Sequence, residues 1–208
     1  MNTCTTTNTN TATTMEISTM KENIHCPEDI ISGKLITKQH RQEQHGRVAG
    51  GGGSRKPEIY QLEKIVEGTG FPCSKTKFRI NKRTIQMHEI AHPMKHSNGF
   101  DYTENFDGMQ KIGEKTVWIN LKSVVGKGGN QTRTLRDECY PFVEAQLHYL
   151  FRTNHTNCFF ANIFDGDEAA ERMRQFNYLL NLPEFENVKK YVYVGDLKTY
   201  FDWVKTAI

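Results

Sequence analysis

Three side chains in the middle of this chain have the types and spacing that metal-dependent cleavage of a phosphodiester requires. Asp107 stands in the segment Phe106-Asp107-Gly108, and Asn120 and Lys122 follow two positions apart. Carboxylate and amide oxygens can bind Mg²⁺, and a lysine can orient a water molecule or offset the charge of a phosphate. We therefore take Asp107, Asn120 and Lys122 as candidate catalytic residues, with Asp107 and Asn120 as the metal ligands.

The residues around Asn120 have the alternation of a strand with one apolar face. Val117, Ile119 and Leu121 are apolar, and successive side chains of a strand point to opposite faces. Asn120 and Lys122 then share the other face. The pattern predicts a β-hairpin in which an acidic residue lies on the strand beside this polar pair.

Further elements follow in a defined order. An apolar-periodic segment over residues 140–151, with a proline in its first turn, predicts a helix. Residues 158–164 have strand character and are followed by a turn. The C-terminal part predicts a helix over 168–180, a strand over 191–194 and a helix over 197–205. The central order is therefore strand, strand, helix, strand.

This order and the signature of Asp107 with Asn120-x-Lys122 resemble the PD-(D/E)XK nuclease superfamily, which includes many restriction endonucleases. The resemblance covers residues 102–164 and implies an α/β fold with a central mixed sheet flanked by helices. It also implies an Mg²⁺-dependent endonuclease acting on double-stranded DNA, with a sequence-specific type II restriction enzyme, often a homodimer, as the narrower form. Asn120 departs from the usual Asp or Glu and removes one negative charge from the site.

Several residues are candidates for accessory roles. Glu104 can supply the missing charge, although its odd spacing from Asp107 would place the two on opposite faces of a regular strand. A helix before the catalytic strands carries an extra acid in some members of the family, and the helix predicted over 58–67 offers Glu63 or Glu67 for that part. On the later helix, Gln146 with Tyr149 is similar to a Gln-x-x-Tyr element that some members place beside the metal.

Positive charge is concentrated in one part of the sequence. Residues 33–83 contain twelve Lys or Arg, four Glu and no Asp, which favours a polyanionic partner. A glycine run at 50–53 is followed by cations, which suits either contact with a phosphate backbone or a linker. A second glycine-rich basic loop follows Lys122, and arginine binds guanine edges and phosphates with its planar fork. The residues expected to contact DNA are Arg55, Lys56, Lys127, Gln131, Arg133 and Arg136.

A competing motif lies upstream. His88-Glu89-Ile90-Ala91-His92 has the H-E-x-x-H spacing by which a zinc metallopeptidase holds Zn²⁺ on one helix. Pro93 directly after His92 argues against that helix, because the residue before a proline is disfavoured in the α region. A zinc metallopeptidase is therefore one alternative, and a non-catalytic DNA-binding protein is the other.

Length and composition limit the possible domain organisation and cellular location of the chain. With 208 residues and 37% hydrophobic content, the chain can hold one domain, expected over residues 55–208, behind a low-complexity, flexible N-terminal region at 1–54 whose start is rich in Thr and Asn. No segment is apolar enough for a membrane span or a secretory signal, so we expect a soluble intracellular protein of the cytoplasm or nucleus. The five cysteines show no C-x-x-C spacing and are expected to be free thiols.

Overall fold

The computed structural model describes residues 55–95, 99–124 and 133–208. The predicted N-terminal region, residues 1–54, lies outside this range, and so do Lys127 and Gln131 of the loop expected to contact DNA.

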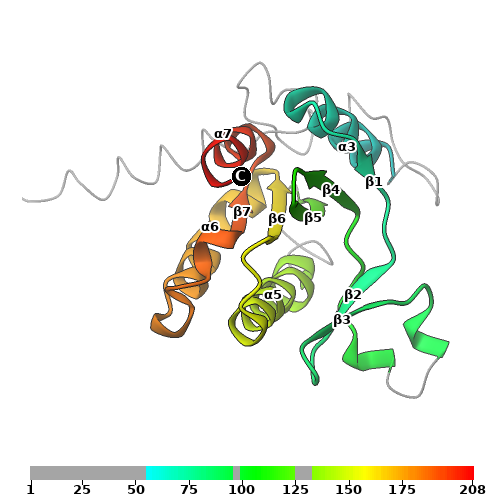
Figure 1. The fold of residues 1–208 in the computed structure, drawn as a ribbon, viewed down its shortest axis with the longest axis vertical. Coiled ribbons are helices and arrows are strands. Elements are labelled where there is room, and N and C mark those ends of the chain that lie inside the picture. Colours follow the sequence, from blue (N-terminus) through cyan, green and yellow to red (C-terminus); the bar gives the residue numbers. More distant parts are fainter. Residues whose placement is uncertain (1–54, 96–98, 125–132) are drawn as a thin grey trace, which may run out of the picture.

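A five-stranded mixed sheet forms the centre of the fold (Figure 1). Its order is β1 (Cys73–Ser74), β4 (Gly108–Ile112), β5 (Lys115–Ser123), β6 (Cys158–Asp165) and β7 (Val192–Gly195). The neighbours β1, β4 and β5 pair antiparallel, whereas β5, β6 and β7 pair parallel. The expected α/β fold with a mixed sheet is confirmed, and the predicted hairpin is β4 and β5.

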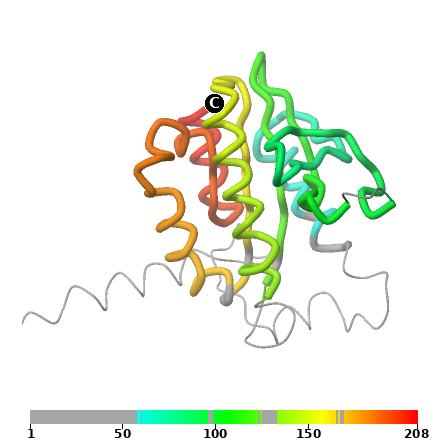
Figure 2. Tube along the Cα trace, turned by 90° about the horizontal axis from the view of Figure 1, so that it is seen from below, coloured from blue at the N-terminus to red at the C-terminus, as the bar shows by residue number. Residues whose placement is uncertain are grey.

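Helices cover both faces of the sheet (Figures 1 and 2). On one face, α3 (Arg55–Thr69) and α7 (Leu197–Ala207) pack against the apolar side of β5, where Val117, Ile119 and Leu121 are buried. On the other face lie α5 (Tyr140–Thr153) and α6 (Asp167–Leu180). The predicted helix ends differ from these by at most a few residues, which is the usual uncertainty of helix boundaries.

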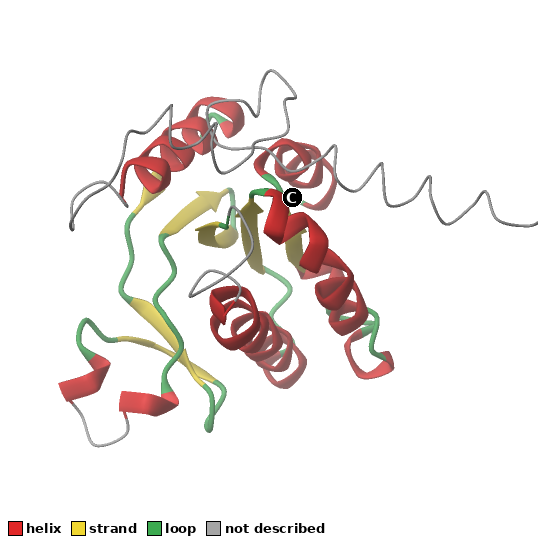
Figure 3. Cartoon of the chain, turned by 180° about the vertical axis from the view of Figure 1, so that it is seen from behind, coloured by secondary structure: helices red, strands yellow, loops and turns green. Residues whose placement is uncertain are grey.

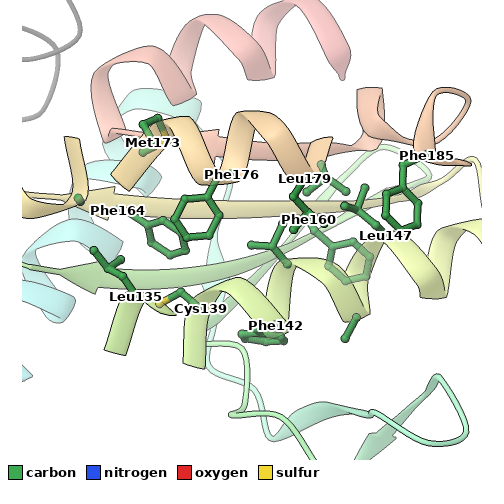
Figure 4. Close-up of a cluster of buried hydrophobic side chains, with 14 of the residues drawn as sticks. Leu135, Cys139, Phe142, Leu147, Phe160, Phe164, Met173, Phe176, Leu179 and Phe185 are labelled. Carbon is green, nitrogen blue, oxygen red and sulfur yellow. The ribbon is translucent and has the colours of Figure 1, made fainter. Parts of the chain in front are cut away.

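The larger core lies between the sheet and the pair α5 and α6 (Figure 4). Phe160 and Phe164 of β6 project into it, and Phe106 stacks on Phe160 with ring centroids 5.4 Å apart. Because β6 has a parallel neighbour on each side and helices on both faces, its sequence is a nearly continuous apolar run. The buried Asn162 interrupts that run.

A second, two-stranded sheet is inserted between β1 and β4 (Figure 3). It consists of β2 (Phe78–Asn81) and β3 (Gln86–Glu89), followed by the short 3₁₀ helices η1 (Pro93–Lys95) and η2 (Gly99–Asp101). Arg79 ties it to the segment before β4 by donating hydrogen bonds to the Thr103 carbonyl (2.9 Å) and to Asn105 Oδ1 (3.0 Å). This hairpin was not predicted from the sequence.

Three more short turns complete the described chain. A π-helical segment, η3 (Thr134–Cys139), leads directly into α5. The 3₁₀ helices η4 (Pro183–Phe185) and η5 (Lys189–Tyr191) connect α6 to β7, so the strand predicted to start at 191 begins one residue later. Within the described ranges, no helix has the length and apolar character needed to cross a lipid bilayer.

Candidate active site

Asp107 is fixed against β5 at the point where β4 begins. Its backbone N–H donates to the Ile119 carbonyl (2.8 Å), and its Oδ2 accepts a hydrogen bond from the Leu121 N–H (2.7 Å). Because Gly108 pairs with Ile119, position 107 lies beside Asn120. The hairpin therefore brings Asp107 next to the Asn120-x-Lys122 segment, as predicted.

Gly108 follows Asp107 for a packing reason. A Cβ at this position would lie 2.6 Å from Cys73 Sγ and 3.0 Å from Leu62 Cδ2. Any other residue here would require the side chains of Cys73 and Leu62 to move.

Lys122 lies between carboxylates. Its Nζ forms an ion pair and hydrogen bond with Glu104 Oε2 and is 3.9 Å from Glu138 Oε2 of η3. The expectation that Glu104 and Asp107 would lie on opposite faces of a strand is wrong, because residues 103–106 are not in a strand. The irregular backbone here allows both acids to act on Lys122.

Burial and the charges of this cluster change the pKa of Asp107. Burial raises the pKa of Asp107 to about 7, against the opposing hydrogen bond from Leu121. The negative charges of Glu58 and Glu104 raise this pKa further, while Lys122 lowers it. The charged form of Asp107 is therefore disfavoured chiefly by burial, and only secondarily by the neighbouring acids.

Lys122 is kept as an ammonium ion. Burial alone would lower its pKa, but the charge and hydrogen bond of Glu104 outweigh burial and raise the pKa above its usual value. Burial, followed by the charge of Glu104, raises the pKa of Glu138. The cluster is thus one cation among several acids.

Glu58 is a member of the cluster that the sequence analysis missed. It lies half-buried in the first turn of α3, and its charge acts on Asp107. Glu63 and Glu67, the acids expected to play this part, are both exposed, and Glu67 pairs with Lys64 (2.6 Å). No signal in the sequence singles out Glu58, because its nearness to Asp107 depends on how α3 docks on the sheet.

Asn120 and Gln146 belong to a buried amide cluster, together with Asn162 of β6. Asn120 is 1% exposed, and its Nδ2 donates to Asn162 Oδ1 (3.1 Å). Gln146 Nε2 donates to the same oxygen (3.0 Å), and Asn162 Nδ2 donates to Gln146 Oε1 (2.7 Å) and to the Tyr193 carbonyl (3.2 Å). Asn120 Oδ1 is buried with no hydrogen-bond partner among the described residues.

Protein ligands for a metal ion are few in the described part of this cluster. Within the described ranges, no group of three or more His, Cys, Asp or Glu side chains is arranged to hold a metal ion. Mg²⁺, however, is usually bound by one or two carboxylates together with substrate phosphates and water. Among the residues predicted as ligands, Asp107 offers a largely buried carboxyl group, whereas Asn120 Oδ1 is unpaired but fully enclosed.

The structure describes the side chains of only some of the residues predicted to contact DNA. Arg133 and Arg136 are exposed at η3, on the same element as Glu138, and Arg136 Nε donates to Asp137 Oδ1 (2.6 Å). The backbones of Arg55 and Lys56 form the first turn of α3, but their side chains lie outside what the structure describes. Arg133 and Arg136 are therefore the predicted DNA contacts whose side chains the structure describes.

The H-E-x-x-H segment does not form a zincin helix. His88 and Glu89 are the last two residues of the strand β3, and His92 follows outside it. Side chains four residues apart are neighbours on a helix, and because this segment is not helical, the H-E-x-x-H spacing does not predict a zinc site here. The ring of His88 instead lies edge-on to Tyr102, with centroids 6.0 Å apart.

Comparisons of this chain with protein-family models, with curated proteins and with solved structures return no match.

Proposed function

We propose that this chain is an Mg²⁺-dependent endonuclease that hydrolyses phosphodiester bonds of double-stranded DNA. The observation that carries the proposal is that two groups lie near the carboxyl end of β5 and act on each other through their charges: the largely buried carboxyl of Asp107 and the ammonium ion of Lys122. Ligands of α/β proteins commonly bind outside the carboxyl ends of parallel strands, which supports this location.

The topology also supports the resemblance to the PD-(D/E)XK superfamily. The order β4, β5, α5, β6 is the strand, strand, helix, strand order that the resemblance implies. A preceding helix, α3, brings an extra acid, Glu58, to bear on Asp107. Sequence-specific cutting by a homodimer, as in type II restriction enzymes, is the narrower form of the proposal.

Each side chain would have a defined task. Asp107 and Asn120 would hold the metal, which when bound supplies charge for the phosphate and lowers the pKa of a bound water. Lys122, kept protonated by Glu104, would donate to a phosphate oxygen or position the attacking water. Glu104 would then release Lys122 when the phosphate enters, because both anions compete for one ammonium ion.

The amide cluster would orient Asn120. Asn162 Oδ1 accepts from Asn120 Nδ2, so this contact fixes which end of the Asn120 amide is nitrogen and leaves its Oδ1 unpaired. An amide oxygen is a weaker ligand than a carboxylate. We therefore expect Mg²⁺ affinity to be low in the absence of DNA and to increase when a phosphate adds its oxygens.

The test is incubation of the full chain with supercoiled plasmid DNA and Mg²⁺ or Mn²⁺. The proposal predicts nicked or linear products that EDTA abolishes, and mapped ends would show whether cutting is sequence-specific. Intact plasmid with either metal over pH 6 to 9 would reject it. Salt-dependent DNA binding without cutting would instead support the non-catalytic alternative.

A further inference from the structure

A second concave site lies at the opposite end of the sheet from Lys122. It is a hollow of about 580 Å³ where β5, β6 and β7 begin, and its volume is within the range of small-molecule sites. We call it the aromatic pocket, and its principal lining residues are Lys115, Phe159, Lys190, Tyr191, Trp203 and Thr206.

Aromatic rings from three elements meet in the aromatic pocket. The ring of Phe159 on β6 is 5.3 Å from Tyr191 and 6.0 Å from Trp203 of α7, both at steep angles. Phe159 is buried, whereas Tyr191 and Trp203 remain partly accessible. A planar ligand can therefore reach the accessible rings.

Two lysines stand over these rings. Lys115 Nζ is 5.6 Å from the centroid of Phe159, and Lys190 Nζ is 5.1 Å from the centroid of Tyr191. None of the described lining residues is acidic, although Lys115 also donates to the Ile208 carbonyl (3.0 Å). The pocket thus combines flat apolar surfaces with an excess of positive charge.

The aromatic pocket is separate from the candidate active site. Lys115 begins β5 and Lys122 is seven positions later, which corresponds to about 23 Å along a strand. Positions 115 and 122 also differ in parity, so their side chains belong to opposite faces of the sheet. A small ligand bound in the aromatic pocket therefore cannot also contact Lys122.

We infer that the aromatic pocket binds a nucleoside phosphate, with the base stacked on Trp203 or Tyr191 and the phosphate held by Lys115 and Lys190. Bases stack on aromatic side chains irrespective of sequence, and ammonium groups bind phosphates as point charges. A purely apolar ligand would form no charge interaction with the two lysines, and a simple anion would form no stacking contact with the aromatic rings. The same chemistry is offered by a free nucleotide and by a nucleotide within a single strand.

Trp203 supplies a direct reporter. The chain has two tryptophans, and Trp118 lies in the other core, packed against Phe78 and Phe106. In a Trp118→Phe background, the fluorescence of Trp203 is followed while AMP, ATP or a pentathymidylate is added without divalent metal. The absence of metal makes the result independent of the proposed nuclease activity.

We expect saturable quenching that Lys190→Ala weakens about tenfold, because a hydrogen bond to a charged group is lost. Lys198→Ala, an exposed lysine of α7 that does not line the pocket, is the matched control and should bind normally. Quenching by AMP or ATP identifies a free nucleotide as sufficient, and quenching by the pentathymidylate alone identifies the strand. No saturable quenching by any of the three, or quenching unchanged in Lys190→Ala, would overturn the inference.

Discussion

The two ends of β5 each carry a lysine, and their surroundings differ completely. Lys122 lies among acids, in contact with Glu104 and 3.9 Å from Glu138, whereas Lys115 stands over the ring of Phe159. At the first end the described acids outnumber the cation, and this is where the metal site is proposed. At the second end cations and aromatic rings predominate, so the pocket favours an anion. The chemistry of each lysine is set by its neighbours, which the register of the sheet selects.

Among substitutions at the acidic end, loss of the Asp107 charge is expected to reduce plasmid cleavage the most. We expect Asp107→Asn to reduce Mg²⁺-dependent plasmid cleavage by more than about 100-fold, since even groups that only support a metal ligand contribute 10-fold to 100-fold. Initial cleavage rates at saturating DNA measure the effect. A variant that folds normally and still cuts at the wild-type rate would show that the acidic end is not the metal site.

The raised pKa of Asp107 predicts an unusual dependence of stability on pH. A carboxyl whose folded pKa is about 7 binds a proton more readily in the folded chain than in the unfolded one, so without metal the protein loses stability as pH rises from about 4 to 7. The full effect is roughly 4 kcal/mol. Urea unfolding at several pH values should show this loss for wild type and a flatter profile for Asp107→Asn. Parallel profiles for the two proteins would contradict the assignment.

Replacing Asn120 by Asp tests the amide cluster between the two ends. The new carboxylate would face Asn162 Oδ1 in place of a donor, and Asn162 cannot turn over without losing its own bonds to Gln146 and Tyr193. We expect a loss of about 2 kcal/mol in the free energy of unfolding without metal. Millimolar Mg²⁺ should recover part of it, because the metal binds only the folded chain. Wild-type stability without metal would show that Asn120 is not held by Asn162.

The smallest effect is expected for Glu58. Glu58→Gln removes a negative charge that raises the pKa of Asp107, so this pKa should fall by a fraction of a unit. NMR titration of the Asp107 carboxyl carbon measures the change. Glu63→Gln on the exposed face of the same helix is the matched control and should leave the titration unchanged. Equal shifts in both variants would mean that Glu58 acts only through the net charge of the protein.

The sequence predicted the parts of the fold that depend on local patterns. Alternation at 117–122 identified β5, helical spacing at 140–151 identified α5, and the apolar run at 158–164 identified β6. The hairpin of β2 and β3 was missed because its turn has no Asn-Gly or Asp-Gly signal. Its left-handed residue is Ile85 (φ 54°), a β-branched type that rarely adopts this conformation.

The candidate site was predicted only where its residues are close in sequence or lie on paired strands of one hairpin. Asp107 lies close to the Asn120-x-Lys122 segment because a short hairpin fixes the register of β4 and β5. Asn162 could not be foreseen beside Asn120, because β5 and β6 are parallel strands joined through α5, and no tight turn specifies their register. Glu58 likewise depends on how α3 docks on the sheet, which a periodic pattern does not specify.

The most direct measurement compares two lysine variants in one plasmid-cleavage assay with Mg²⁺. Lys122→Ala removes the cation of the acidic cluster, and Lys111→Ala removes an exposed lysine of the neighbouring strand β4 as the control. We predict a fall of about 100-fold to 10,000-fold in the cleavage rate for Lys122→Ala and a wild-type rate for Lys111→Ala. Equal cleavage by both variants, with unchanged thermal unfolding, would contradict the placement of the chemistry at the carboxyl end of β5.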